Sequence, residues 1–113
     1  MVKKSYIPER GDIVWLNFTP QPGHEQKGKR PAIVLSPEAY NSKVGLAVFC
    51  PITSKQKGYP FEVEVISQKI NGVVLSDQVK SLDWSSRSIQ FIEKAKTEVI
   101  QDVLDKLNTL VAP

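Results

Sequence analysis

Arg30 and Thr53 are the residues whose types and spacing point most directly to chemistry in this sequence. They flank two apolar runs, residues 31–35 and 45–50, that are typical of strands. If these strands pair antiparallel, opposed positions sum to about 82, which places Arg30 within a residue or two of Thr53 across the hairpin. A guanidinium beside a hydroxyl at one end of a hairpin suits a phosphate group. The alternative is an ordinary surface arginine and a threonine in a turn.

Two polar loops, 19–29 and 52–59, leave from that same end of the hairpin and surround it with charge. Basic grooves with interleaved aromatic rings bind single-stranded nucleic acid. Candidate contacts for such a ligand are Trp15, Lys29, Ser54, Lys55, Lys57, Lys80, Trp84 and Arg87, with Phe18, Tyr59 and Phe61 as further aromatic residues. The alternatives are that Trp15 and Phe61 belong to the core and that the lysines form a solvated face.

Short strands separated by turn residues are predicted to position these side chains. We expect strands at 13–18, 31–35, 45–50, 61–66 and 88–92, and extended segments at 73–75 and 78–80. The first run is apolar on both faces, and we expect each face to be at least partly covered, whereas 61–66 alternates and has one mostly wet face. We expect a short helical turn capped by Ser36 and running through Tyr40, a turn at 41–45, a loop at 51–58 and a tight turn at Asn71-Gly72.

Residues Thr97 to Val111 are predicted to form the one long helix, with Thr97 as its cap and Glu98 in the first turn. Apolar residues at spacings of three and four form one stripe, which we expect to pack on the core: Val99, Ile100, Val103, Leu104, Leu107, Leu110 and Val111. Several short strands closed by one helix predict a mainly β fold, a small antiparallel barrel with a packed C-terminal helix.

The composition of the 113 residues is that of a globular protein, with 41% hydrophobic and 24% charged residues, and we expect residues 1–113 to form a single domain. The net charge of +3 is compatible with a polyanionic partner. No apolar run approaches the roughly 18 residues of a membrane span, and no apolar segment follows the N-terminal lysines, so we expect neither a membrane anchor nor a signal peptide. The single cysteine, Cys50, is expected to be a buried, inert thiol in a reducing cytoplasm, and the single histidine, His24, gives no metal cluster.

Short motifs follow one another from about Tyr6 to Val111 in a characteristic order. They are Gly11-Asp12-Ile13-Val14, GHEQKGKRP, AIVLSP, the PIT triplet, KGYPFEV and NGVVLSDQVKSLDW. In this order they resemble the MazF/PemK family of toxin ribonucleases. The resemblance implies the CcdB/PemK-like toxin fold, a homodimer of SH3-like barrels. It also implies a sequence-specific, metal-independent endoribonuclease that cuts single-stranded mRNA, needs no cofactor, inhibits translation and growth, and is held by an antitoxin in its RNA groove.

The same resemblance assigns roles to particular residues. The arginine and threonine that carry the chemistry of the family match Arg30 and Thr53, and the glutamate of the first loop matches Glu25. The Asp-Gln-Val-Lys stretch matches Asp77 to Lys80, which adds Gln78 to the candidate RNA contacts. Ser54 supplies a second hydroxyl beside Thr53.

RNA carries its own nucleophile, the 2′-hydroxyl, so cleavage to a 2′,3′-cyclic phosphate and a 5′-hydroxyl needs alignment, proton transfer and charge stabilisation. Arg30 suits the phosphorane charge and Thr53 can donate a hydrogen bond to it. Glu25 is the candidate general base, or else it orients Arg30. Two rival functions stay open: an SH3-like module that binds without cutting, and a toxin on the same barrel that poisons gyrase.

Overall fold

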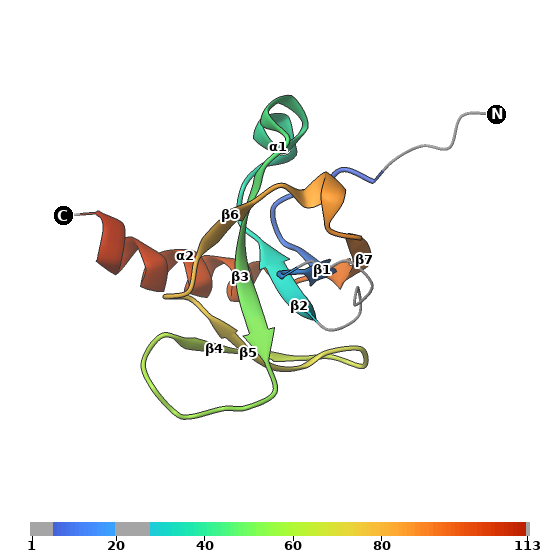
Figure 1. Ribbon diagram of the computed structural model, residues 1–113. Coiled ribbons are helices and arrows are strands. Elements are labelled where there is room, and N and C mark those ends of the chain that lie inside the picture. The colour runs from blue at the N-terminus through green and yellow to red at the C-terminus, as the bar shows by residue number, and fades with distance from the viewer. Residues whose placement is uncertain (1–5, 20–27, 113) are drawn as a thin grey trace.

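The computed structural model describes residues 6–19 and 28–112, and it consists of a curved antiparallel sheet with two α-helices (Figure 1). The strands are β1 (Asp12–Asn17), β2 (Lys29–Val34), β3 (Ala47–Thr53), β4 (Glu62–Ile66), β5 (Asn71–Leu75), β6 (Lys80–Leu82) and β7 (Gln90–Lys94). The helices are α1 (Glu38–Val44), α2 (Thr97–Val111) and the short 3-10 turn η1 (Trp84–Ser86). The prediction of a mainly β fold with a C-terminal helix is confirmed.

The sheet has the strand order β4-β5-β3-β2-β1-β7, and every neighbouring pair is antiparallel. On the edge of β3 opposite β2, β6 pairs with the first half of β3 and β5 pairs with its last residues. Strand β3 is therefore shared between two sheet segments, and the sheet bends around β3 into a half barrel. In Figure 1, β6 lies against the first half of β3, and α2 lies beside the sheet.

Both faces of the central strands are buried, because consecutive residues of β1 and β2 enter different hydrophobic clusters. Ile13 and Ile33 join a cluster covered by α2, whereas Val14 and Ala32 join a second cluster with Phe49. This arrangement confirms the prediction that both faces of the first strand are at least partly covered. It also follows the alternation of side chains along a strand, which gives each face of β1 and β2 its own core.

Helix α2 has the predicted bounds and packs one apolar face against the first cluster, with Val103 completely buried. The prediction that the whole stripe is core is wrong at its end, where Leu110 and Val111 are 54% and 70% exposed. Thr97 is the first helical residue and not the cap, because Lys96 occupies the N-cap position. Within residues 6–19 and 28–112, neither helix has the length and apolar character needed to cross a lipid bilayer.

Three predicted connections differ from the structure. Residues 41–45 are not a turn, because α1 continues to Val44 and ends at Gly45 in the left-handed conformation. Ser36 does not cap α1; Pro37 is at the N-cap, and the Ser36 hydroxyl donates to the buried Asn41 side chain at 2.6 Å. The Asn71-Gly72 turn is wrong as well, since both residues pair in β5 and the chain reverses at 67–70.

Strand bounds shift by a few residues from those predicted, and one shift matters for the site. The predicted loop over 51–58 begins only after Thr53, because β3 includes Pro51 to Thr53. The last strand lies at Gln90–Lys94 and not at 88–92. The longer β3 places Thr53 on a strand paired with β5, and so on a more rigid support than a loop would give.

Candidate functional site

Arg30 and Thr53 lie at the same end of the β2–β3 hairpin, as predicted. Ala32 pairs with Pro51, so the observed register differs from the predicted one by one residue. If this register is continued by two residues along both strands, Arg30 lies across from Thr53. The start of β2 and the end of β3 lie together at the lower end of the sheet in Figure 1. A pocket of about 490 Å³ opens here, and its lining is Arg30, Thr53, Lys55, Lys57, Tyr59, Glu62, Leu75 and Gln78.

The Thr53 side chain is held by its own strand and the loop that follows. Its Oγ1 accepts a hydrogen bond from the Lys55 backbone N–H at 3.2 Å. This bond uses an oxygen lone pair, so the hydroxyl hydrogen can be donated to a phosphate oxygen. Thr53 also pairs with Val73 in β5, which fixes the backbone of the residue that carries the hydroxyl.

The pocket is rich in positive charge. Arg30, Lys55 and Lys57 contribute three cationic side chains from β2 and from the loop between β3 and β4. Arg30 is exposed at the pocket rim, where its planar fork is accessible to a ligand. The only carboxylate of the lining as described is Glu62, which accepts backbone N–H groups from Lys57 and Gly58, both at 2.8 Å. This set of groups suits a phosphate anion better than a metal cation.

Tyr59 lines the pocket on the side of the loop and is held there by Asp77. The Tyr59 hydroxyl donates to Asp77 Oδ1 at 2.7 Å, and this hydrogen bond is the main reason that the pKa of Tyr59 is raised to about 12. The bond links the β3–β4 loop to the segment that follows β5 and carries Gln78. At neutral pH Tyr59 is therefore a phenol that holds this side of the pocket together.

Three lining residues were not among the sequence-predicted contacts: Tyr59 was placed only among the nearby aromatics, and Glu62 and Leu75 were placed on strands. Glu62 is missed because a carboxylate is not expected to approach an anionic ligand. Leu75 is missed because its position depends on the pairing of Leu75 with Glu62 across β4 and β5. The sequence signal that could have identified Glu62 is its place on the polar face of the predicted 61–66 strand.

Three of the other predicted contacts lie outside the lining of this pocket. Lys29 Nζ donates to Gln90 Oε1 on β7 at 2.8 Å. Lys80 is exposed on β6 and lies 5.9 Å from the centre of the Phe18 ring. Trp84 packs against the second cluster, and its Nε1 donates to the Asn41 carbonyl at 3.2 Å. That Lys29, Lys80 and Trp84 contact RNA stays a prediction. Trp84 also has a structural role, because it packs against the second cluster.

Arg87 is engaged within the chain and mostly buried. Its Nη1 donates to the Phe18 carbonyl at 2.8 Å and its Nε to Asp83 at 2.7 Å. Hydrogen bonds from Ser86 and then Arg87 lower the pKa of the Asp83 carboxyl to about 2. Arg87 thus anchors the end of β1, and a contact with RNA would need these bonds to be exchanged.

Trp15, Ser54 and Glu25 complete the predicted set. Trp15 is 38% exposed, so its reading as core is wrong, and it pairs with Pro31. Strand alternation therefore directs Trp15 to the face opposite that of Arg30. Ser54 is exposed next to Thr53 but is absent from the pocket lining. Glu25 lies outside the described residues.

Cys50 is buried in the first cluster, as predicted for a structural thiol. Burial, with a smaller contribution from the charge of Asp77, raises the pKa of the thiol to about 12. A thiol in this environment is protonated at neutral pH and is a poor nucleophile.

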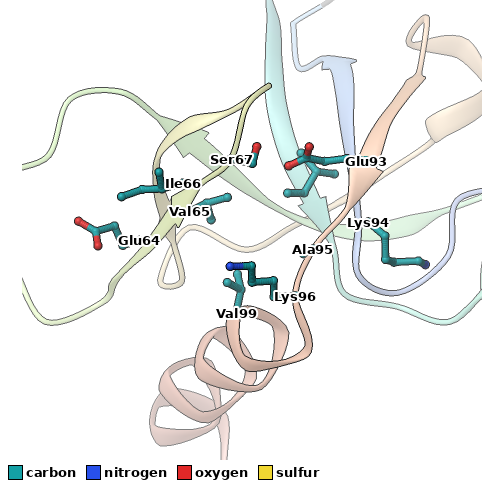
Figure 2. Close-up of a pocket in the computed structure, with 10 residues that line it drawn as sticks. Glu64, Val65, Ile66, Ser67, Glu93, Lys94, Ala95, Lys96 and Val99 are labelled. Atoms are coloured by element: carbon teal, nitrogen blue, oxygen red, sulfur yellow. The ribbon is translucent and has the colours of Figure 1, made fainter.

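Two further pockets lie away from Arg30 and Thr53. One, of about 340 Å³, lies between the edge strand β4 and the β7–α2 junction, with Glu64, Ser67, Glu93 and Lys96 around it (Figure 2). The other is an apolar groove where Tyr40, Val48, Leu104 and Leu107 meet. The first pocket balances its lysines with Glu64 and Glu93, and the second is mostly apolar, so neither has the excess of cationic side chains found in the Arg30–Thr53 pocket.

Comparison with known proteins agrees with this architecture. Residues 9–111 match the family model described as the PemK-like, MazF-like toxin of type II toxin–antitoxin systems. The endoribonuclease toxin MazF of Escherichia coli (strain K12) is 44% identical over 94% of this chain and 96% of its own length. MazF from Deinococcus radiodurans has a TM-score of 0.86 and 51% identity, over 96% of this chain and all of that one. A MazE–MazF complex from the same organism gives a TM-score of 0.85 and 46% identity, over 96% of this chain and 98% of that one. The chain therefore belongs to the PemK-like, MazF-like family of toxins of type II toxin–antitoxin systems.

Proposed function

We propose that this protein, an endoribonuclease toxin of the MazF/PemK family, cleaves single-stranded mRNA at short sequence motifs without a metal ion. The observation that carries the proposal is the pocket that Arg30 and Thr53 line together with Lys55 and Lys57. Such a pocket offers cationic and hydroxyl donors to one phosphate. Cleavage of mRNA in the cytoplasm would stop translation and growth.

The proposed mechanism uses the 2′-hydroxyl of RNA as the nucleophile and gives a 2′,3′-cyclic phosphate and a 5′-hydroxyl. Arg30 stabilises the two non-bridging oxygens of the phosphorane through its planar fork. Thr53 donates its hydroxyl hydrogen to the same group, which it can do while its oxygen accepts the Lys55 N–H. Glu25 takes the 2′-proton and returns it, directly or through water, to the leaving 5′-oxygen; in the alternative role Glu25 orients Arg30 and water carries both protons.

Metal independence gives the most direct test of this mechanism. Purified protein is expected to cut single-stranded RNA in EDTA and to leave duplex RNA largely intact, because the 2′-hydroxyl must be free to rotate into line. Gel analysis of labelled RNA measures the cleavage, and end-group analysis identifies the cyclic phosphate. Cleavage that begins only when a divalent ion is added, or products with a 5′-phosphate, would contradict the mechanism.

We further propose that the protein forms a homodimer and that its antitoxin competes with RNA for the Arg30–Thr53 pocket. The support is the cationic rim, which would attract an acidic, disordered segment able to fold on binding. Two MazE–MazF complexes of Deinococcus radiodurans contain a chain whose structure is similar to that of this protein. The rim residues Lys55 and Lys57 are exposed and therefore accessible to either ligand.

Charge reversal tests the shared pocket. Lys55→Glu with Lys57→Glu is expected to weaken both RNA and antitoxin at least about tenfold, mainly through slower association. Arg87→Glu is unsuitable, since Arg87 is bonded within the chain. Lys43→Glu with Lys106→Glu makes the same charge change outside the pocket lining and is the matched control. Unchanged antitoxin affinity in the first variant, measured by surface plasmon resonance, would separate the two binding sites.

The same experiments discriminate the rival functions. A binding module would hold RNA in EDTA without producing fragments, whereas a gyrase poison would inhibit DNA supercoiling and leave RNA intact. The paired arginine and threonine favour the ribonuclease, because neither rival needs a phosphorane-stabilising group beside a hydroxyl.

A further inference from the structure

The loop formed by residues 54–61, between β3 and β4, builds one wall of the Arg30–Thr53 pocket. It carries Lys55, Lys57 and Tyr59, whose side chains line the pocket, yet it contains no strand or helix of its own. Figure 1 shows it as a wide arc that leaves the sheet after β3 and returns at β4. An arc of this kind places charged side chains accurately only if something outside it fixes its backbone.

Glu62 makes the contacts that can fix this backbone. It is the first residue of β4 and pairs with Leu75 of β5, so its position is set by the sheet. Its Oε2 accepts the Lys57 N–H and its Oε1 accepts the Gly58 N–H, both at 2.8 Å. Gly58 has a φ of +83°, a left-handed conformation that glycine adopts without strain and that lets two consecutive amides converge on one carboxylate.

The Tyr59–Asp77 bond holds the same loop at a second point. The Glu62 backbone N–H also donates to the Tyr59 carbonyl at 3.2 Å, which closes a turn where the loop enters β4. Two carboxylates on the sheet side, Glu62 and Asp77, therefore accept hydrogen bonds from three consecutive loop residues, Lys57 to Tyr59.

A carboxylate in a pocket for an anion calls for an explanation other than charge. Glu62 lies among Arg30, Lys55 and Lys57, where a negative side chain would by itself oppose a phosphate. We propose that Glu62 is a positioning residue: it fixes the 54–61 loop so that Lys55 and Lys57 face Arg30 and Thr53, and thereby seats the RNA. This inference rests on the proposed function of the pocket and adds to it a residue that does not itself touch the reacting atoms.

Charge and positioning predict opposite results, which makes the inference testable. If Glu62 acted only through its charge, Glu62→Ala would strengthen RNA binding. If Glu62 positions the loop, the variant is expected to bind RNA about tenfold more weakly, because two charge-assisted hydrogen bonds are lost. Glu62→Gln keeps one acceptor oxygen, so an intermediate loss of about threefold is expected from it. Affinities are measured with uncleaved RNA in a Thr53→Ala background.

Glu64 provides the matched control. It lies two residues further along the same strand, is exposed, and is absent from the lining of the Arg30–Thr53 pocket. Glu64→Ala and Glu64→Gln remove the same charge, and each is expected to leave RNA affinity unchanged or slightly stronger. In the protein that retains Thr53, Glu62→Ala should raise KM more than it lowers kcat. The reason is that the substitution disturbs the 54–61 loop, which binds RNA, more than it disturbs Arg30 and Thr53 at the reacting phosphate.

Amide hydrogen exchange supplies a readout that does not depend on RNA. The Lys57 and Gly58 amides are expected to exchange at least about tenfold faster in Glu62→Ala than in the wild-type protein, since they lose their acceptor. Exchange in β2 should be unchanged. If Glu62→Ala does not fold, Glu62→Gln carries the same comparison.

The inference is overturned if Glu62→Ala binds RNA as tightly as Glu64→Ala, or if its loop amides keep wild-type exchange rates, while the wild-type protein still cuts RNA. A wild-type protein that neither binds nor cuts RNA is a different result. It would overturn the proposed function, and this inference with it.

Discussion

Replacement of Arg30 with alanine is expected to slow RNA cleavage at least about a hundredfold, the loss typical of removing one donor from a site that stabilises an oxyanion. In the proposed mechanism Arg30 is the group whose fork can bind two phosphorane oxygens at once. The residue is exposed, so its removal is expected to change the free energy of unfolding by no more than about 0.5 kcal/mol. The loss should therefore appear in kcat and not in the amount of folded protein.

Single-turnover cleavage at saturating RNA measures this effect, with thermal unfolding of the same preparations as the check on folding. Arg30→Lys separates charge from geometry: it keeps the cation but loses the planar fork, so we expect it to recover only a small part of the rate. Lys43→Ala, on α1, removes a cation elsewhere and should cleave normally. Cleavage by Arg30→Ala within about threefold of wild type would remove Arg30 from the catalytic site, since a single oxyanion donor contributes far more than that.

Replacement of Gly72 with alanine is expected to impair both stability and cleavage, although Gly72 lies outside the pocket lining. A Cβ at this position would lie 2.4 Å from the Thr53 carbonyl oxygen and 3.0 Å from its carbonyl carbon. Both atoms are backbone, so β3 or β5 must shift. We expect overpacking to lower the free energy of unfolding by about 1–3 kcal/mol. The displacement of Thr53 should slow cleavage at least about tenfold, because small misplacements of a catalytic group are costly.

Gly45→Ala is the control that separates general destabilisation from displacement of Thr53. Gly45 has a φ of +78° at the end of α1, and nothing lies within 4 Å of a Cβ placed there. Alanine at this position is expected to cost about 1 kcal/mol through backbone strain alone and to leave kcat unchanged. Denaturant unfolding and single-turnover cleavage are measured on both variants. Equal kcat values for Gly72→Ala and wild type would show that Thr53 tolerates the shift.

Local sequence was sufficient where a single pattern determined the outcome. The spacing of apolar residues from Thr97 to Val111 predicted α2 with its observed bounds, because a helix is specified by contacts three and four residues apart. The juxtaposition of Arg30 and Thr53 was also predictable. A hairpin with a known centre has its register determined within a residue or two, and the ends of its strands must then meet.

Asn71-Gly72 shows where local preference failed. This pair is a strong turn signal, yet it forms the start of β5. The reason is tertiary: Gly72 must lie against the Thr53 carbonyl, and the absence of a side chain at residue 72 allows the two strands to approach closely. Gly72 was predicted to form a tight turn, but in the structure it allows β5 to pack closely against β3 next to the site.

The sequence by itself determined the helix, the paired arginine and threonine, and the basic character of the surrounding loops, since each depends on spacing or composition within a short segment. Only the tertiary structure decided which charged residues share a pocket. It brought Glu62 to the loop amides of Lys57 and Gly58, turned Trp15 to the other face, and bound Arg87 to the carbonyl of Phe18. Side-chain type does not distinguish an exposed cation from one that satisfies buried backbone carbonyls. That difference arises from contacts between segments far apart in the chain.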